Sequence, residues 1–336
     1  MSDSDTTPPL RLMIVGAAGS GAGKSTVCLS LLGALLRDKG FRAEDLAYIK
    51  PCTQGVQQTL VAKWCHDRGV ACRHVGPVVF FNGFTRQFLS GALDPDLYLD
   101  EDARATPPPS EGGEGRARLR ALYTQRMQRR IRRSVEEIGR GKRLVLIDGV
   151  GYPGVGSICG VCNATVARLV GAQVLVVGKP GLGDCIDSFN VARGYMEGAE
   201  GPDGVAAAKE SRVLGLLVNR VRKGGGAKKT AAVSLYFEPG SAASAQGYKL
   251  YGLVAEREEL FAAHAAGAGG VGDAAYAAPG EHNQCSVTFG APEPEQLAVE
   301  ALTDAERAIC DGLIDGFAED VGMEKLRELV EDCGRR

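Results

Sequence analysis

The sequence predicts an α/β fold, a doubly wound and mostly parallel sheet of about seven strands, on the strength of three observations. Short, continuous apolar runs recur along the chain, and segments of helix length separate them. A run without alternating polar residues is typical of a strand buried on both faces, as in a parallel sheet covered by helices. Finally, the first run ends in a glycine-rich turn that leads into a helical pattern.

Seven runs are the candidate strands of this sheet, and most are rich in valine, isoleucine and leucine. In chain order they are Leu10–Val15, Arg42–Ile49, Val75–Phe81, Leu144–Ile147, Val174–Val177, Val213–Val218 and Tyr248–Val254. The helical pattern that follows the first run covers Thr26–Arg37.

The length of 336 residues fits one large α/β domain with insertions. We expect residues 1–9 to be a disordered N-terminus and residues 10–336 to form a single domain. Segments 103–115 and 262–280 are rich in glycine with proline or alanine, which predicts loop insertions. Residues 295–333 predict a C-terminal extension of two amphipathic helices, which pack on the sheet edge or on a partner.

Composition narrows the class of protein. Hydrophobic residues make up 44% of the chain, ample for a sizeable core, and the net charge of −2 gives no argument for nucleic acid or membrane. No run approaches the length of a membrane span, and the N-terminus lacks a secretory signal. We expect a soluble cytoplasmic protein that binds neither nucleic acid nor membrane.

One segment has a local charge excess, because eight arginines lie between residues 116 and 133. A helix with this composition can bind a polyanion. The interpretation we favour is a long helix whose arginines face solvent while Leu119, Leu122, Met127 and Ile131 turn elsewhere.

The glycine-rich turn has the pattern of a P-loop. Its core, Ala18–Ser25, opens with alanine where the pattern has glycine, and it lies between an apolar strand and a helix. Small residues let backbone N–H groups surround phosphate oxygens, while Lys24 reaches the terminal phosphates and the Ser25 hydroxyl binds Mg²⁺. The predicted nucleotide-binding residues are Gly19, Ser20, Gly21, Ala22, Gly23, Lys24, Ser25 and Thr26. ATP and Mg²⁺ are therefore the expected cofactors.

Asp148 follows the apolar run LVLI directly, which is the arrangement of a Walker B carboxylate. We predict that Ser25 and Asp148 hold the metal. The alternative is an aspartate that caps the next helix.

Lys50 ends the second predicted strand in the segment YIKPCTQG. Ligands bind at the carboxyl ends of parallel strands, so this lysine is expected to point into the same crevice as Lys24. It could stabilise charge on a phosphoryl group in transfer. The alternative is an exposed surface lysine.

Three segments carry a family resemblance, and a fourth, Gly215–Asn219, is a weaker match. Ser20–Thr26 matches the SGxGKTT loop of cobyrinic acid a,c-diamide synthases, and Lys50–Gly55 matches the KPxxxG motif of dethiobiotin synthetases. Asp148–Gly151 is similar to the EGAGG segment of the latter, and Gly215–Asn219 to their strand ending in asparagine. The chain thus resembles the dethiobiotin synthetase-like P-loop NTPases, whose clan includes the diamide synthases and the MinD-type ATPases.

The resemblance implies an ATP-dependent ligase of biotin biosynthesis, in which a diamine and CO₂ give a carbamate, ATP phosphorylates it, and the second amine closes the ring. It implies catalytic roles for Lys24, Lys50 and Ser20, and adenine recognition by Asn219. The implied partners are a small diamine or carboxylate-like substrate and a second copy of the chain in a homodimer.

Departures from the family motif motivate an alternative function. Gly21 stands where the family has glutamate, and Asp148 is shorter than the family's glutamate. Gln54 replaces the serine or threonine before the last glycine of KPxxxG, and Gly19 occupies the place of the MinD signature lysine. The alternative is a nucleotide-binding protein without ligase activity that acts as a structural or interaction component or as an ATPase switch.

Two cysteine groups have a possible chemical function. Cys159 and Cys162 form a CxxC pair, and Cys65, His66, Cys72 and His74 could supply four zinc ligands. The spacing matches no common zinc module, and one CxxC pair is weak evidence for a redox site. We favour structural roles for both groups.

Overall fold

The computed structural model describes residues 8–18, 21–38, 40–56, 58–94, 112–198, 212–222, 230–258, 260 and 299–335. The predicted insertion 262–280, most of 103–115 and nearly all of the predicted disordered N-terminus lie outside the described residues. The same holds for Gly19 and Ser20.

A seven-stranded sheet forms the centre of the fold, and every pair of neighbouring strands in it is parallel. The strands are β1 (Leu10–Gly16), β2 (Leu46–Ile49), β4 (Ala71–Arg73), β6 (Leu144–Asp148), β7 (Gln173–Gly178), β8 (Val213–Val221) and β9 (Lys249–Ala255). Their order is β4-β2-β6-β1-β7-β8-β9, so the chain starts near the middle and extends to both edges. The predicted doubly wound parallel sheet is confirmed.

One predicted strand lies in the wrong place. The run Val75–Phe81 yields only β5 (Val78–Val79), which pairs with β3 (Cys52–Thr53) in a separate two-stranded sheet. The edge of the main sheet is instead β4, which has three partly exposed residues. So short an edge strand contains no apolar run to detect.

The predicted strand Arg42–Ile49 begins later than expected, at Leu46. The 3₁₀ helix η1 (Ala43–Asp45) precedes it, and the Asp45 carboxylate accepts a hydrogen bond from the backbone N–H of Arg42.

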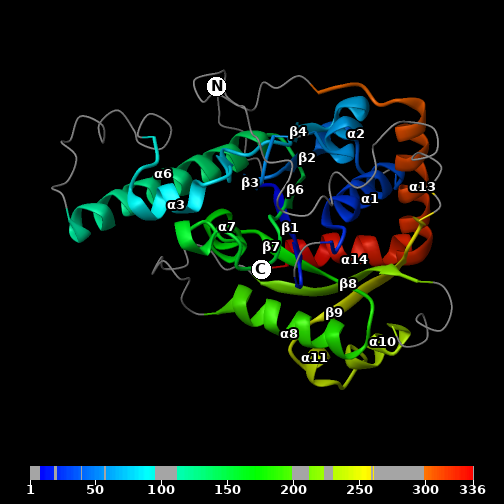
Figure 1. The fold of residues 1–336 in the computed structure, drawn as a ribbon. Coiled ribbons are helices and arrows are strands. Elements are labelled where there is room, and N and C mark those ends of the chain that lie inside the picture. Colours follow the sequence, from blue (N-terminus) through cyan, green and yellow to red (C-terminus); the bar gives the residue numbers. More distant parts are fainter. Residues whose placement is uncertain are drawn as a thin grey trace, which may run out of the picture.

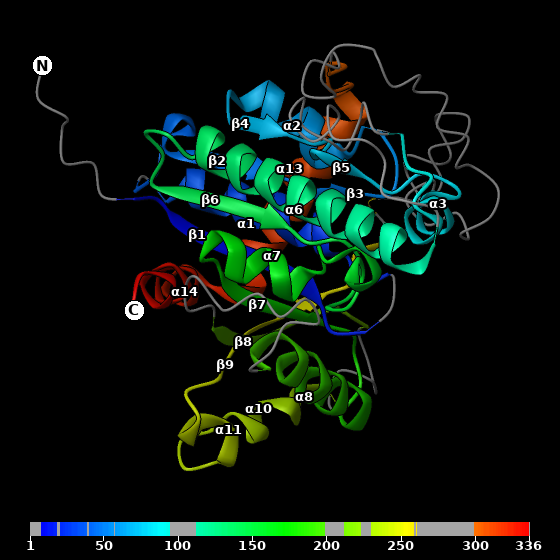
Figure 2. The same cartoon turned by 90° about the vertical axis from the view of Figure 1, so that its left-hand side faces the viewer.

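Helices cover both faces of the sheet, as Figures 1 and 2 show. One face carries α1 (Lys24–Arg37), α2 (Leu60–Arg68), α13 (Asp304–Val321) and α14 (Met323–Gly334). The other carries α3 (Phe84–Ser90), α6 (Gly113–Ile138), α7 (Asn163–Val170), α8 (Gly183–Glu197), α10 (Val233–Tyr236) and α11 (Ala242–Ala245). Successive residues of β1 enter the two cores in turn, with Leu12 and Ile14 on the first face and Met13 and Val15 on the second.

Helix α6 contains the arginine-rich segment, and it begins at Gly113, so the last three residues of the loop predicted over 103–115 are helical. Tyr123, Met127, Ile131 and Val135 recur every four residues and are buried against the sheet. Five of the eight arginines are exposed. This geometry agrees with the solvated-face interpretation. Among the described residues, no helix is long and apolar enough to cross a membrane.

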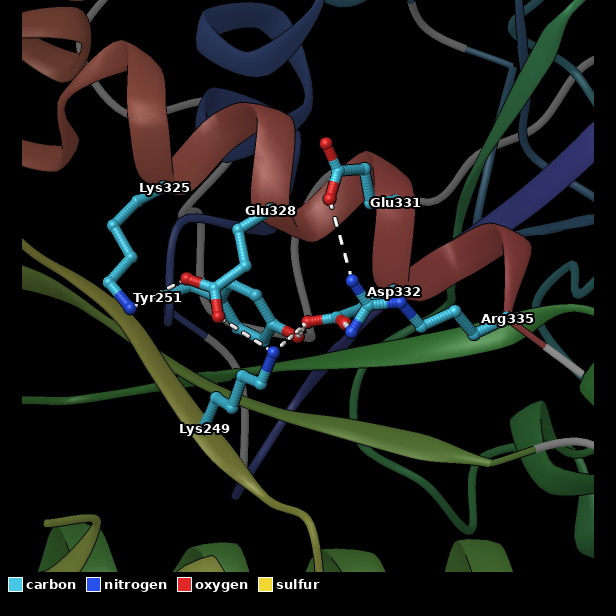
Figure 3. A network of polar contacts seen from close by, with 7 residues as sticks. All are labelled: Lys249, Tyr251, Lys325, Glu328, Glu331, Asp332 and Arg335. Carbon is cyan, nitrogen blue, oxygen red and sulfur yellow. Dashed lines mark hydrogen bonds and ion pairs between the residues drawn. The ribbon is translucent and has the colours of Figure 1, made fainter. Parts of the chain in front are cut away.

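The C-terminal helices pack on the sheet rather than standing apart from it, with α13 against α1 and β9 and α14 against β1 and β9. Figure 3 shows the polar contacts that hold α14. Asp332 Oδ2 accepts hydrogen bonds from Tyr251 OH at 2.8 Å and Lys249 Nζ at 2.6 Å, and Glu328 pairs with the same lysine at 2.6 Å.

We expect Asp332→Ala to lower the free energy of unfolding by about 2–3 kcal/mol. The substitution leaves the buried Tyr251 hydroxyl without its acceptor and leaves Lys249 with Glu328 as its remaining ion-pair partner. Urea denaturation measures this change in free energy. The matched control is Glu331→Ala on the same helix, whose carboxylate is exposed, and the expected change is within about 0.5 kcal/mol. If both variants lost the same free energy of unfolding, the cause would be a change in helix propensity and not the loss of these contacts.

Candidate functional site

The candidate site lies at the carboxyl ends of the strands, where β1 and β6 are direct neighbours and Ile14 is paired with Asp148. The P-loop connects β1 to α1, which begins at Lys24. Gly21 and Gly23 have φ angles of 87° and 74°, and the second of them caps the helix. Both angles lie in the left-handed region that favours glycine. The N-terminus of α1 is therefore presented to the site, as an anion requires.

The left-handed backbone at Gly21 explains one departure from the family pattern, since a glutamate there would be strained. The outer side of the loop is braced by β8. Asn219 is 5% exposed and donates from Nδ2 to the Ala22 carbonyl at 3.0 Å, while Arg220 donates to the Gly21 carbonyl at 3.3 Å. Any side chain at Gly23 would meet Asn219 Nδ2 at 2.3 Å. Asn219 thus holds the loop, and its role in reading adenine stays a prediction.

Asp148 is the centre of the polar contacts. Its side chain is 1% exposed, and its Oδ2 atom accepts hydrogen bonds from Ser25 Oγ at 2.7 Å and from Tyr48 OH at 2.8 Å. Lys50 Nζ lies 3.3 Å from the same oxygen. The buried Oδ1 atom has no hydrogen-bond partner within the described part of the chain.

These residues fit a magnesium ion. Mg²⁺ takes hard oxygen ligands and keeps several waters, so one carboxylate and one hydroxyl suffice as protein ligands. The buried Oδ1 atom lacks a partner, and a buried acceptor without one is costly, so a metal ion or a water molecule would suit this position. Asp148 and Ser25 could hold the ion together, as their direct contact shows them to be adjacent.

The site contains more positive than negative charge. Burial alone would raise the pKa of Asp148, but Lys50 and Lys24 and the hydrogen bonds from Ser25 and Tyr48 outweigh it and hold the pKa below its usual value. Burial lowers the pKa of Lys24; Asp148 opposes that shift and Lys50 adds to it. Two lysines therefore share one buried carboxylate, which leaves excess positive charge for an anion such as a triphosphate.

Lys50 is positioned by a tight backbone contact. Its N–H donates to the Arg73 carbonyl at 3.0 Å, and β3, which starts two residues later, pairs with β5. Gly76 passes so close that a Cβ atom there would lie 2.1 Å from the Lys50 carbonyl oxygen and 2.4 Å from that of Pro51. The backbone around Lys50 is therefore held by its contacts with Arg73 and Gly76, and it is not a free surface loop.

We expect Gly76→Ala to lower the free energy of unfolding by about 1–3 kcal/mol, because backbone atoms must move to admit the methyl group. Chemical denaturation measures the loss. The matched control is Gly194→Ala within α8, where nothing lies within 4 Å of the added Cβ, and a gain of about 0.5–1 kcal/mol is expected. A neutral Gly76→Ala would show that the Lys50 segment is not held in this way.

Two residues that the sequence analysis did not select also shape the site. Tyr48 binds Asp148 directly, and its signal was a hydroxyl in an otherwise apolar strand. Asn163, at the start of α7, donates from Nδ2 to the carbonyls of Val150 and Tyr152 and accepts from the Val150 N–H at 3.0 Å, so it clamps the loop after Asp148. No local motif marks it.

The remaining predicted residues have modest roles. Thr26 is half-buried in the first turn of α1. Cys159 ends the 3₁₀ helix η2 (Ser157–Cys159) and Cys162 directly precedes α7, and both are buried, in agreement with a structural role. Of the four candidate zinc ligands, His66 is exposed, whereas Cys65 and His74 are buried. In the described ranges, no group of three or more histidine, cysteine or acidic residues could hold a metal ion.

Comparisons with known proteins find only distant structural likeness. No protein-family model matches the sequence, and no curated protein sequence matches it. A solved complex of Cyanothece McdA with ATP is 13% identical, covers 93% of this chain and 98% of its own, and has a TM-score of 0.41. The MinD cell division protein of Aquifex aeolicus is 14% identical over 75% of this chain and 84% of its own, with a TM-score of 0.34. Such loose superpositions carry no argument about function.

Proposed function

We propose that this protein binds Mg²⁺ and ATP at its P-loop and works as a nucleotide-dependent ATPase switch. The observation that carries the proposal is the convergence of Lys24, Ser25 and Lys50 on Asp148, whose second carboxylate oxygen has no partner. The site has an excess of partly buried positive charge beside a helix N-terminus, and a triphosphate would supply the missing negative charge.

The residues divide the work by position. Lys24 and the backbone of the loop bind the phosphates, while Ser25 and Asp148 hold the metal. The ion, when bound, neutralises charge on the phosphate oxygens. Tyr48 keeps the Asp148 carboxylate in place through its hydrogen bond. The clamp made by Asn163 fixes the loop that follows the carboxylate.

Lys50 is the element that makes a switch. Its ammonium group is paired with Asp148 at 3.3 Å. If that carboxylate held a divalent cation, the pairing would be weakened, and Lys50 would be available to contact a terminal phosphate. The lysine belongs to the segment that carries β3, so its movement reaches the small sheet of β3 and β5. Nucleotide state would thereby be coupled to a surface outside the P-loop.

A second candidate is the ligase function, favoured by one observation: Lys50 of the KPxxxG segment lies against the metal-site carboxylate. In that case the lysine stabilises phosphoryl transfer to a carbamate or carboxylate. Against it stand Gly21, whose backbone favours glycine over the family's glutamate, and the shorter Asp148.

ADP release distinguishes the two functions. Purified protein is incubated with Mg²⁺ and ATP, alone and with 7,8-diaminononanoate and bicarbonate. The switch predicts slow basal hydrolysis that the diamine does not stimulate; the ligase predicts turnover only when the diamine is present. GTP in place of ATP tests the base. Light scattering with and without ATP tests the proposed homodimer.

A further inference from the structure

Two cysteines meet at the edge of the main sheet, one on α2 and one on β4. Cys65 lies in the last turns of α2 and Cys72 in β4, and Gly69 closes the turn between these elements with a φ angle of 71°. The Val70 N–H donates to the Cys65 carbonyl at 2.9 Å, which fixes the turn. Cys65 belongs to the core between α2 and the sheet, Cys72 packs against that core, and Cys65 hydrogen-bonds to Cys72.

The two thiols differ in burial. Cys65 is fully buried, whereas Cys72 is partly exposed at the edge strand. His74, two residues further on, is 6% exposed, and its buried Nε2 atom has no hydrogen-bond partner in the described part of the chain. The arrangement therefore combines a partly exposed cysteine, a buried cysteine that contacts it and an unpartnered imidazole nitrogen.

The charge pattern favours ionisation of Cys72 and not of Cys65. The hydrogen bond from Cys65 lowers the pKa of the Cys72 thiol, burial opposes the shift, and His74 and Lys50 lower the pKa further. Burial raises the pKa of Cys65, and the neighbouring Cys72, Cys28 and Cys310 raise it as well. On β2, Tyr48 is paired with Cys72 in the sheet, and its own pKa is raised mainly by burial, so it stays neutral.

We propose that Cys72 is a reactive thiolate that hydrogen peroxide oxidises, and that Cys65 resolves the product into a reversible disulfide between α2 and β4. The Cys72 thiolate attacks one peroxide oxygen; the O–O bond breaks, and hydroxide leaves and takes up a proton as water. Sulfur is oxidised to sulfenic acid and peroxide is reduced. The Cys65 thiol then attacks the sulfenic sulfur, an S–S bond forms, and a second water leaves.

This site borders on the proposed nucleotide site, because Lys50 lowers the pKa of Cys72, and Tyr48, which binds Asp148, is paired with Cys72 in the sheet. The proposal does not rest on the nucleotide function, since peroxide chemistry at Cys72 and Cys65 uses no residue of the P-loop. Its partly exposed thiolate beside a resolving thiol is the arrangement expected of a redox-sensitive cysteine. The consequence is a covalent link across the turn at Gly69, which dithiol reductants reverse.

Peptide mapping tests the proposal on the full chain carrying Cys285→Ser, which removes a cysteine outside the described residues. Trypsin separates the two sulfurs, since Trp64–Arg68 contains Cys65 and Gly69–Arg73 contains Cys72. After mild peroxide treatment we expect these two peptides to be joined and to separate on reduction with dithiothreitol. A peroxide-treated protein in which this pair stays reduced, or in which Cys159 and Cys162 link first, overturns the proposal.

Two variants and the pH dependence of alkylation test which cysteine is oxidised and which one resolves the sulfenic acid. Cys65→Ser should stop the reaction at a sulfenic acid on Cys72 that dimedone traps, whereas Cys72→Ser should leave Cys65 unmodified. The control Cys333→Ser removes a buried thiol elsewhere and should change nothing. On the unaltered chain, iodoacetamide should alkylate Cys72 with a midpoint clearly below the value of about 8.5 of a free cysteine. A midpoint at or above that value contradicts the proposal without any variant.

Discussion

Lys24→Met is expected to abolish ATP binding and to leave the fold at least as stable as before. Lys24 is the partly buried first residue of α1, where its ammonium group can reach phosphates bound by the loop. Loss of one desolvated charge contact costs about 2–5 kcal/mol, which weakens the affinity roughly 30- to 4,000-fold. Isothermal titration calorimetry with ATP and Mg²⁺ measures it.

The stability half of this prediction has its own physical reason. Burial lowers the pKa of Lys24, so the charged lysine destabilises the nucleotide-free protein at neutral pH. A lysine whose pKa is lowered on folding is most unfavourable below its folded pKa, and the effect disappears as the pH rises past the unfolded value of about 10.4. The melting temperature of Lys24→Met at pH 7 should therefore equal or exceed that of the parent. The control, Lys325→Met on the exposed side of α14, should keep full affinity.

Asp148→Asn is expected to lower the rate of magnesium-dependent ATP hydrolysis by at least about 100-fold, because the amide keeps the shape of the carboxylate but loses the charge that a hard cation needs. It should also destabilise the nucleotide-free protein by about 3 kcal/mol, since Lys50 and Lys24 then face each other without a counter-charge. Hydrolysis assays and chemical denaturation measure the two effects.

The pH dependence of this loss provides a further check. The pKa of Asp148 is lowered on folding, so its ionised form stabilises the native state above the unfolded pKa of about 3.9. That contribution is lost as the pH falls through the lower folded value. The stability difference between the parent and Asp148→Asn should thus be full at pH 7 and shrink below pH of about 4. A difference that stays constant as the pH falls well below about 4 would contradict the assigned charge.

Much of the site could be predicted from sequence because its chemistry depends on local patterns. The P-loop, Asp148 and Lys50 each follow an apolar strand, and parallel strands deliver their carboxyl ends to one edge. The structure does bring Lys50 to Asp148. The hydrogen bond from Asn219 to the Ala22 carbonyl could not be predicted, because an asparagine at the end of a strand does not indicate which backbone group its amide will bind.

What escaped prediction depends on contacts distant in sequence. Tyr48 and Asn163 act through partners that only the fold brings near, Asp148 and the loop after it. The edge strand β4 is three residues long and pairs on one side only, so it needs no apolar run. The stronger run at Val75–Phe81 was misplaced because an apolar run reports burial and not the sheet to which a strand belongs.

Calorimetric titration with ATP tests most directly whether Lys24, Ser25 and Asp148 form a Mg²⁺·ATP site. The full chain is titrated with Mg²⁺ and with EDTA, and Lys24→Met is titrated with Mg²⁺. We expect one-to-one binding with a Kd below about 1 mM that weakens in EDTA and vanishes in the variant. An affinity for ATP that is the same in all three titrations, or no binding by the parent protein, would contradict it.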